Sequence, residues 1–177
     1  MWGKASRRAR PGAGFWIALI ILATPAGCGY TVRSALPSHL KTLAIPSFGN
    51  NTVEFGLSDD ITQSLVSGFL ADRHLRIVQE RDANAVLRGT VVAYKNQVFG
   101  YTSKERATEY EIVLTVQVSF RDMVKNHDLW KEDALTVRTT YNVVPVGTEP
   151  AKTETDGRRD VIQKLTDQVV SRTVQGW

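Results

Sequence analysis

Residues 111–121, EIVLTVQVSFR, alternate between apolar and mostly polar side chains along their whole length. This period of two is that of a β-strand, in which successive side chains point to opposite faces of a sheet. The apolar set, which would lie on one face, is Ile112, Leu114, Val116, Val118 and Phe120. One face of the predicted sheet must therefore be buried under a second layer, and the remaining elements are expected to supply that layer.

Four further segments read as strands of the same sheet. Residues 85–99 (AVLRGTVVAYKNQVF) precede the central strand, and residues 129–143 (LWKEDALTVRTTYNV) follow it, with Leu135, Val137 and Tyr141 on one face. Shorter apolar runs stand at 41–48 and 74–78. Pro46 suits a strand end because it has no backbone N–H to donate.

Two segments show the spacing of one-sided helices. In residues 57–73 the apolar positions are Leu57, Ile61, Leu65 and Phe69 at i+4 spacing, with Val66 and Leu70 beside them. Ser58-Asp59-Asp60 supplies a candidate cap and acids for the first turn. In residues 156–177 the apolar positions are Val161, Ile162, Leu165, Val169 and Val174. The order predicts an α+β two-layer sandwich: a mixed, mostly antiparallel sheet of four to five strands with both helices packed on one face.

The N-terminus has the pattern of a secretory signal peptide. Its first fourteen residues contain four basic side chains and no acidic one. The apolar run FWIALIILA at 15–23 is far too short to span a bilayer, which takes about 20 residues. We therefore divide the chain into a signal peptide at 1–27, a tether at 28–40 and a single domain at 41–177.

Cys28 is the only cysteine, and the mature chain is predicted to start there. With Ala26-Gly27 before it, this residue resembles the lipidated cysteine of the bacterial lipobox, although Pro25 stands where that motif usually has leucine. The alternative is an ordinary signal peptide followed by a free thiol, an unusual feature in an oxidising compartment. Gly29 takes the place of the aspartate that usually retains lipoproteins at the inner membrane, which favours the outer membrane.

Charge and residue chemistry exclude several function classes. Removing residues 1–27 leaves 18 of the 22 Lys and Arg against all 18 Asp and Glu, so the mature chain is neutral and no nucleic-acid partner is expected. His39, His74 and His127 have no metal-ligand spacing, and we find no phosphate-binding glycine loop. We therefore expect neither catalysis nor a metal or cofactor.

Two tracts that lie between predicted strands or before a predicted helix are rich in basic side chains. Residues 98–110 (VFGYTSKERATEY) are predicted to form the tip of a hairpin between two strands, and they place Lys104 and Arg106 among the aromatic residues Phe99, Tyr101 and Tyr110. Residues 151–160 (AKTETDGRRD) contain Lys152, Arg158 and Arg159. Such a mixture suits a ligand with an anionic head and an apolar body. The alternative for each tract is solvated charge on a loop.

Several stretches resemble the LptE family of lipopolysaccharide-assembly outer-membrane lipoproteins. They are CGYTVR at 28–33, LPSHLKTLAIPSF at 36–48, ADRHLRIVQERDANAVLRGTV at 71–91 and ATEYEIVLTVQVSFRD at 107–122. The likeness runs in order over nearly all of residues 28–177, and Thr108-Glu109-Tyr110 before the alternating strand is its most telling local piece.

The resemblance implies a lipid-anchored protein on the periplasmic side of the outer membrane, held by acyl chains such as palmitate. It would plug the LptD β-barrel, support the assembly of that barrel, and bind lipopolysaccharide during delivery to the outer leaflet. By region, the family's basic ligand-binding residues correspond to Lys104, Arg106, Lys152 and Arg158. The ANAVLRG segment at 83–89 also resembles the N-terminal domain of TolB, so the alternative is a periplasmic lipoprotein adaptor of another envelope complex.

Replacing Cys28 with alanine tests the lipoprotein interpretation. The Cys28→Ala chain should lack acyl groups and accumulate as a precursor or a soluble species, whereas residues 41–177 should still fold because the thiol lies outside the predicted core. Intact mass spectrometry of the purified wild-type chain is the check. A mature mass without acyl chains would contradict the interpretation.

Overall fold

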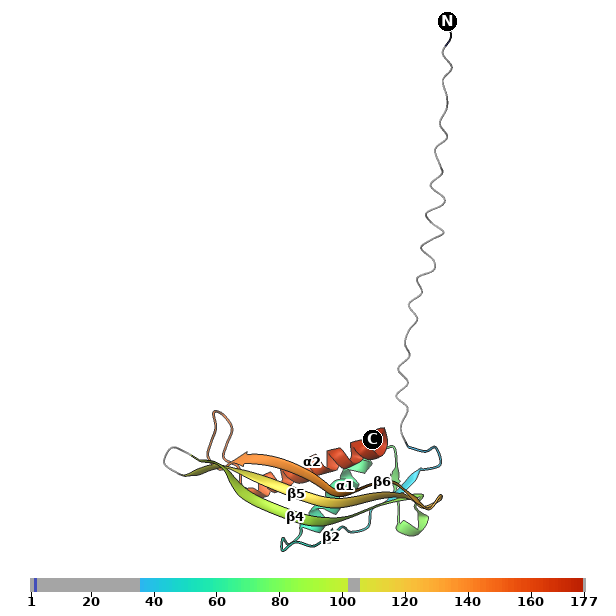
Figure 1. Cartoon of the computed structure of the whole chain (residues 1–177), viewed down its shortest axis with the longest axis horizontal. Coiled ribbons are helices and arrows are strands. Elements are labelled where there is room, and N and C mark those ends of the chain that lie inside the picture. The colour runs from blue at the N-terminus through green and yellow to red at the C-terminus, as the bar shows by residue number, and fades with distance from the viewer. Residues whose placement is uncertain (1, 3–35, 102–105, 177) are drawn as a thin grey trace. The chain divides into compact units, whose positions relative to one another are not determined.

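The computed structural model describes residue 2 and residues 36–101 and 106–176 (Figure 1). The chain divides into two units, Met1–Val32 and Arg33–Trp177, and the helices and strands of the described residues belong to the second. Cys28 and Lys104 lie outside the described residues. Within the described part, no helix is both long and apolar enough to cross a membrane.

Within the part of the chain that the structure describes, six strands form one mixed sheet in the order β3-β1-β4-β5-β6, with β2 also paired to β4. Their bounds are Thr42–Ala44 (β1), Gly49–Asn50 (β2), Arg76–Ile77 (β3), Ala85–Tyr101 (β4), Ala107–Asp122 (β5) and His127–Asn142 (β6), with a short 3₁₀ helix η1 at Glu80–Asp82. The long strands β4, β5 and β6 pair with one another in antiparallel fashion. The short strand β1 is parallel to its partners β3 and β4, and β2 is parallel to its partner β4. The strand count exceeds the predicted four to five because Gly49–Asn50 forms an additional short strand, β2.

The predicted apolar face of β5 is confirmed. Its five alternate side chains are at most 1 % exposed. They continue across the sheet in register, since Val116 pairs with Val91 of β4 and Leu135 of β6. This row and its neighbours form the inner face of the sheet.

Both helices cover that inner face, as predicted. Helix α1 spans Leu57–Asp72 and α2 spans Glu154–Gln175. The four α1 positions at i+4 spacing and the five α2 positions are buried and belong to the same core cluster as the inner face of β4, β5 and β6. Of the two apolar side chains beside the α1 row, Val66 is half-buried and Leu70 is exposed. Figure 1 shows the two helices lying behind the three long strands. The α+β two-layer sandwich is therefore the observed fold.

The two helices touch where side chains are small. A Cβ added at Gly68 of α1 would come within 2.5 Å of the Thr166 methyl carbon of α2, so this position requires glycine. One turn earlier, the hydroxyl oxygens of Ser64 and Thr166 lie 2.8 Å apart. The bond satisfies a buried hydroxyl, because Thr166 is 1 % exposed.

The helices start differently. Thr153 caps α2, accepting from the Asp156 N–H while the Asp156 carboxylate accepts from the Thr153 N–H, which is a capping box. The cap predicted for α1 at Ser58 is wrong, since the residue before α1 is Gly56 with a left-handed φ of 73° and no side-chain cap bond. Glycine tolerates this conformation, and the acids at Asp59 and Asp60 do occupy the first turn.

The outer face of the sheet is lined largely by polar side chains that bond to one another. Gln117 donates to Asp133 at 2.7 Å, and Gln97 donates to Glu111 at 2.9 Å. The Thr115 and Thr136 hydroxyl oxygens lie 3.1 Å apart. Because these pairs satisfy their own hydrogen bonds, this face needs no covering layer to be stable.

The start of the described domain is fixed to the turn between β5 and β6. Leu40 is buried in the core, and His39 Nε2 lies 2.6 Å from Asp122 Oδ2. Asp122 also accepts from the N–H groups of Val124 and Lys125. Burial raises the pKa of this carboxyl, but these hydrogen bonds outweigh burial and the pKa is lowered overall. The last residues of the predicted tether thus pack against the domain.

Two Val→Asp variants on opposite faces of β5 test the register. Val116→Asp places a carboxylate in the core and should lower the free energy of unfolding by more than about 3 kcal/mol. Val113→Asp places the same group on the outer face between Lys95 and Arg138, its cross-strand partners, and should cost less than about 1 kcal/mol. Chemical denaturation measures both, and equal losses would contradict the assignment of the two faces.

Candidate functional site

The two basic tracts lie at the same end of the sheet. Val143 donates its N–H to the Thr108 carbonyl at 3.0 Å, and Lys152 donates its N–H to the Asn142 carbonyl at 2.7 Å. The loop that follows β6 is therefore held beside the start of β5, as Figure 1 shows. Arg106, which is exposed, comes directly before β5, so the structure brings Arg106 and Lys152 to one end.

Apolar side chains are exposed at this end of the sheet. Phe99 and Tyr101 at the end of β4 are 60 % and 65 % exposed, and the loop after β6 adds Val144 and Val146. Tyr110 differs from the expectation, because its ring stacks on that of Tyr141 with centroids 5.6 Å apart. This end of the sheet, the basic end, thus presents apolar and basic groups together. Tyr110 instead packs against Tyr141.

Lys152 is exposed on the loop that precedes α2. Its ammonium Nζ bonds to Asp160 Oδ2 at 2.8 Å, and that bond and the charge of Asp160 raise its pKa. The ammonium is therefore charged throughout the physiological range. Because an exposed pair of this kind is weak, an anionic ligand could displace Asp160 at little cost.

Arg158 is held far more firmly. It donates to the Phe55 carbonyl at 2.8 Å, its Nε lies 3.5 Å from Asp60 Oδ2, and its guanidinium lies 5.8 Å from the centre of the Tyr94 ring. Only 20 % of its side chain is exposed. Arg158 therefore ties α2 to the start of α1 and to β4, a structural role that its sequence context did not indicate.

Tyr94 completes this cluster. Its hydroxyl donates to Glu154 at 3.2 Å. Burial, followed by the charge of Glu154, raises the pKa of the Tyr94 phenol. The phenol therefore stays protonated and keeps its role as a donor at the N-terminus of α2.

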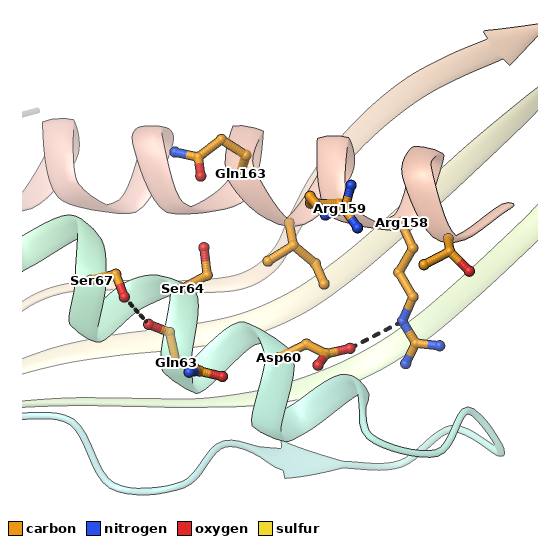
Figure 2. A pocket seen from close by; sticks show the side chains of 9 residues that line it. Asp60, Gln63, Ser64, Ser67, Arg158, Arg159 and Gln163 are labelled. Carbon is orange, nitrogen blue, oxygen red and sulfur yellow. Dashed lines mark hydrogen bonds and ion pairs between the residues drawn. The ribbon is translucent and has the colours of Figure 1, made fainter. Parts of the chain in front are cut away.

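A groove of about 440 Å³ runs between the two helices next to Arg158 (Figure 2). Helix α1 lines it with Asp60, Gln63, Ser64 and Ser67, and α2 with Thr155, Arg158, Arg159, Ile162 and Gln163. Nearly all of these residues are polar, and they include two guanidinium groups and one carboxylate. Sequence periodicity did not reveal the groove because its walls are the polar faces of two helices about 100 positions apart. The adjacent arginines Arg158 and Arg159 were the only feature of the sequence that pointed to this region.

Of the three histidines, His39 and His74 have acidic partners. His39 is next to Asp122, and His74 Nδ1 lies 2.8 Å from Asp72 Oδ2. Over residues 36–101 and 106–176, no three His, Cys, Asp or Glu side chains are grouped so that they could hold a metal ion. The candidate site is therefore described by its basic and apolar side chains.

Two neighbouring arginines on α2 test the structural role of Arg158. Arg158→Ala removes a largely buried guanidinium with three contacts and should lower the free energy of unfolding by about 1 to 3 kcal/mol. Arg159→Ala is the matched control, because that side chain is 73 % exposed and its guanidinium pairs with Asp156 on the same helix; its cost should stay within about 0.5 kcal/mol. Thermal or chemical unfolding that shows the same loss for both would refute the role.

Comparison with solved structures identifies the fold. The chain is similar to a minor lipoprotein from Acinetobacter baumannii (24 % identity, 77 % of this chain and 92 % of that one, TM-score 0.50). It is also similar to the PelC dodecamer subunit from Paraburkholderia phytofirmans (17 %, 82 % and 98 %, 0.52) and to a protein from Xanthomonas campestris (10 %, 79 % and 87 %, 0.57). At these identities the likeness shows the fold alone.

Comparison at the sequence level identifies the family. Among curated proteins no significant match was found. The sequence model of the LptE family, described as lipopolysaccharide-assembly, matches residues 40–173, which is most of the chain and nearly all of the folded domain. The chain therefore belongs to the LptE lipopolysaccharide-assembly family.

Proposed function

We propose that this chain is an outer-membrane lipoprotein that fills the lumen of an LptD-type β-barrel, supports assembly of that barrel, and binds lipopolysaccharide on its way to the outer leaflet. The family match over residues 40–173 is the observation that carries the proposal. The chain is anchored from the periplasmic side through acyl chains on Cys28. It acts by binding and not by catalysis.

The outer face of the sheet supports a role inside a barrel. The interior of an outer-membrane barrel is polar. The outer face offers polar side chains that already bond in pairs, such as Gln117 with Asp133 and Thr115 with Thr136. Side chains paired in this way can lie against a polar wall without leaving their polar groups unsatisfied, which would be costly.

The basic end of the sheet supports lipopolysaccharide binding. Lipopolysaccharide presents phosphates and acyl chains close together, so a complementary site needs cations and apolar surface side by side. Among the described residues, Arg106 and Lys152 supply the cations, and Phe99 and Tyr101 supply exposed apolar surface at the same end. Charge-assisted hydrogen bonds to phosphate oxygens contribute about 1.5 to 3 kcal/mol each.

Affinity purification of the tagged chain from outer membranes, with mass spectrometry of the co-purifying proteins, tests the barrel partnership. An LptD-type barrel should be recovered in an amount comparable to that of the bait. Recovery of a different envelope complex without any such barrel would contradict the proposal and favour the adaptor alternative.

The double variant Lys104→Ser with Arg106→Ser tests the ligand site. It should weaken lipopolysaccharide binding at least tenfold, since losing about 1.4 kcal/mol is sufficient for that, while leaving the barrel bound. The control, Arg81→Ser with Lys125→Ser, removes the same charge at the opposite end, where Met123 donates its N–H to the Asn84 carbonyl. Binding to immobilised lipopolysaccharide and barrel co-purification are measured on the same preparations.

The outcomes of that experiment separate the alternatives. Unchanged affinity in the folded double variant would refute the hairpin as the ligand site and shift the assignment to Lys152 and Arg158. Loss of barrel association with unchanged affinity would instead identify the hairpin as a docking element.

A further inference from the structure

A second group of basic side chains lies on the outer face of the sheet, away from the basic end. Arg88 of β4 pairs with Ser119 of β5, and Ser119 pairs with Lys131 of β6, so the three residues form one row across three strands. Neighbouring strands are about 4.8 Å apart, which places the two cationic residues about 10 Å apart with a hydroxyl between them. Their long side chains can therefore reach a common ligand above Ser119.

This row borders a hollow that the backbone creates. The edge of β4 that faces away from β5 pairs in parallel with two short strands, with β1 at Val86 and with β2 at Thr90. The intervening segment 45–48 leaves the sheet at Pro46, whose nitrogen has no hydrogen to donate. The resulting hollow of about 430 Å³ lies beside Pro46 and Ser47 and extends across the face to Lys131.

The lining of the hollow is cationic and rich in hydroxyl groups. Arg88 and Lys131 supply the charges, Ser47, Thr90 and Ser119 supply hydroxyls, and no described lining residue is acidic. The acids that pair with the two cations, Glu80 and Asp133, are not among the lining residues. The hollow therefore differs from the helix groove, which contains a carboxylate.

We propose that this hollow binds a phosphate group through Arg88, Ser119 and Lys131. The oxygens of a phosphate point in tetrahedral directions, so a phosphate site needs hydrogen-bond donors on several sides. In this hollow the donors come from β4, β5 and β6 and from the segment at Ser47. A guanidinium can donate two parallel bonds to such a group, while an ammonium acts as a point charge. The chemistry fits both a free phosphate and the phosphate of a lipid headgroup.

The ion pairs at the site do not prevent this binding. The side chains of Arg88 and Lys131 are each 49 % exposed, and their partners Glu80 and Asp133 are 47 % and 69 % exposed. Pairs that are this exposed contribute little to stability. An incoming phosphate can therefore take over both cations while the carboxylates remain in water.

Calorimetric titration of the purified full-length lipoprotein in a non-ionic detergent, with inorganic phosphate at constant ionic strength, tests the proposal. Arg88→Gln with Lys131→Gln should weaken phosphate binding at least tenfold. The control is Arg121→Gln with Arg138→Gln, which removes two charges from the same face outside the hollow. It should change the affinity less than twofold, and thermal unfolding checks that each variant is folded.

Two results would overturn the site: no saturable binding of phosphate to the wild type, or equal weakening by the two double variants. A short-chain, water-soluble phosphatidic acid then distinguishes the sources. Binding at least tenfold tighter than that of inorganic phosphate, and dependent on Arg88 and Lys131, supports the site and identifies a lipid headgroup. Equal affinities support the site and identify free phosphate. The titration uses the purified chain without the barrel and leaves Lys104 and Arg106 unchanged, so the site stands or falls separately from the proposed function.

Discussion

Val116 and the other alternate side chains of β5 lose nearly all their exposed surface between the sheet and two helices, and the remaining structure depends on this burial. Each fully buried aliphatic or aromatic side chain contributes about 1.5 to 3 kcal/mol. Because the strand period is two, the same alternation places Thr115, Gln117 and Ser119 on the opposite face. A register slip of one residue would exchange the two faces, so the apolar pattern fixes the pairing of β4, β5 and β6.

The buried core and the accessible polar and basic groups are consequently located in different parts of the domain. The helices and the inner face of the sheet form the core. The outer face and the basic end of the sheet carry accessible polar and basic groups. Arg158 connects the two parts, because it stabilises the junction of α1, α2 and β4 beside the polar groove. Its largely buried guanidinium makes it a weaker candidate for direct ligand contact than Lys152, whose side chain is exposed.

Sequence periodicity predicted the parts of this structure that depend on local patterns. The alternating face of β5 and the buried positions of α1 follow from spacing within one segment, and both are confirmed. Features that need contacts between distant segments could not be predicted in this way. Arg158 meets the Phe55 carbonyl 103 positions away, and the row of Arg88 and Lys131 exists only once the strand register is known. The cap of α1 failed for a local reason, because Gly56 adopts a left-handed conformation where a side-chain cap was expected at Ser58.

The most direct test of the account is depletion of this chain in the bacterium that produces it. Two quantities are measured together: the folded fraction of the LptD-type barrel, from its heat-modifiable migration, and the lipopolysaccharide displayed at the cell surface. If the chain supports barrel assembly and lipopolysaccharide delivery, both quantities fall and the wild-type chain restores both. A barrel that stays folded and surface lipopolysaccharide that stays at its normal level after depletion would contradict it.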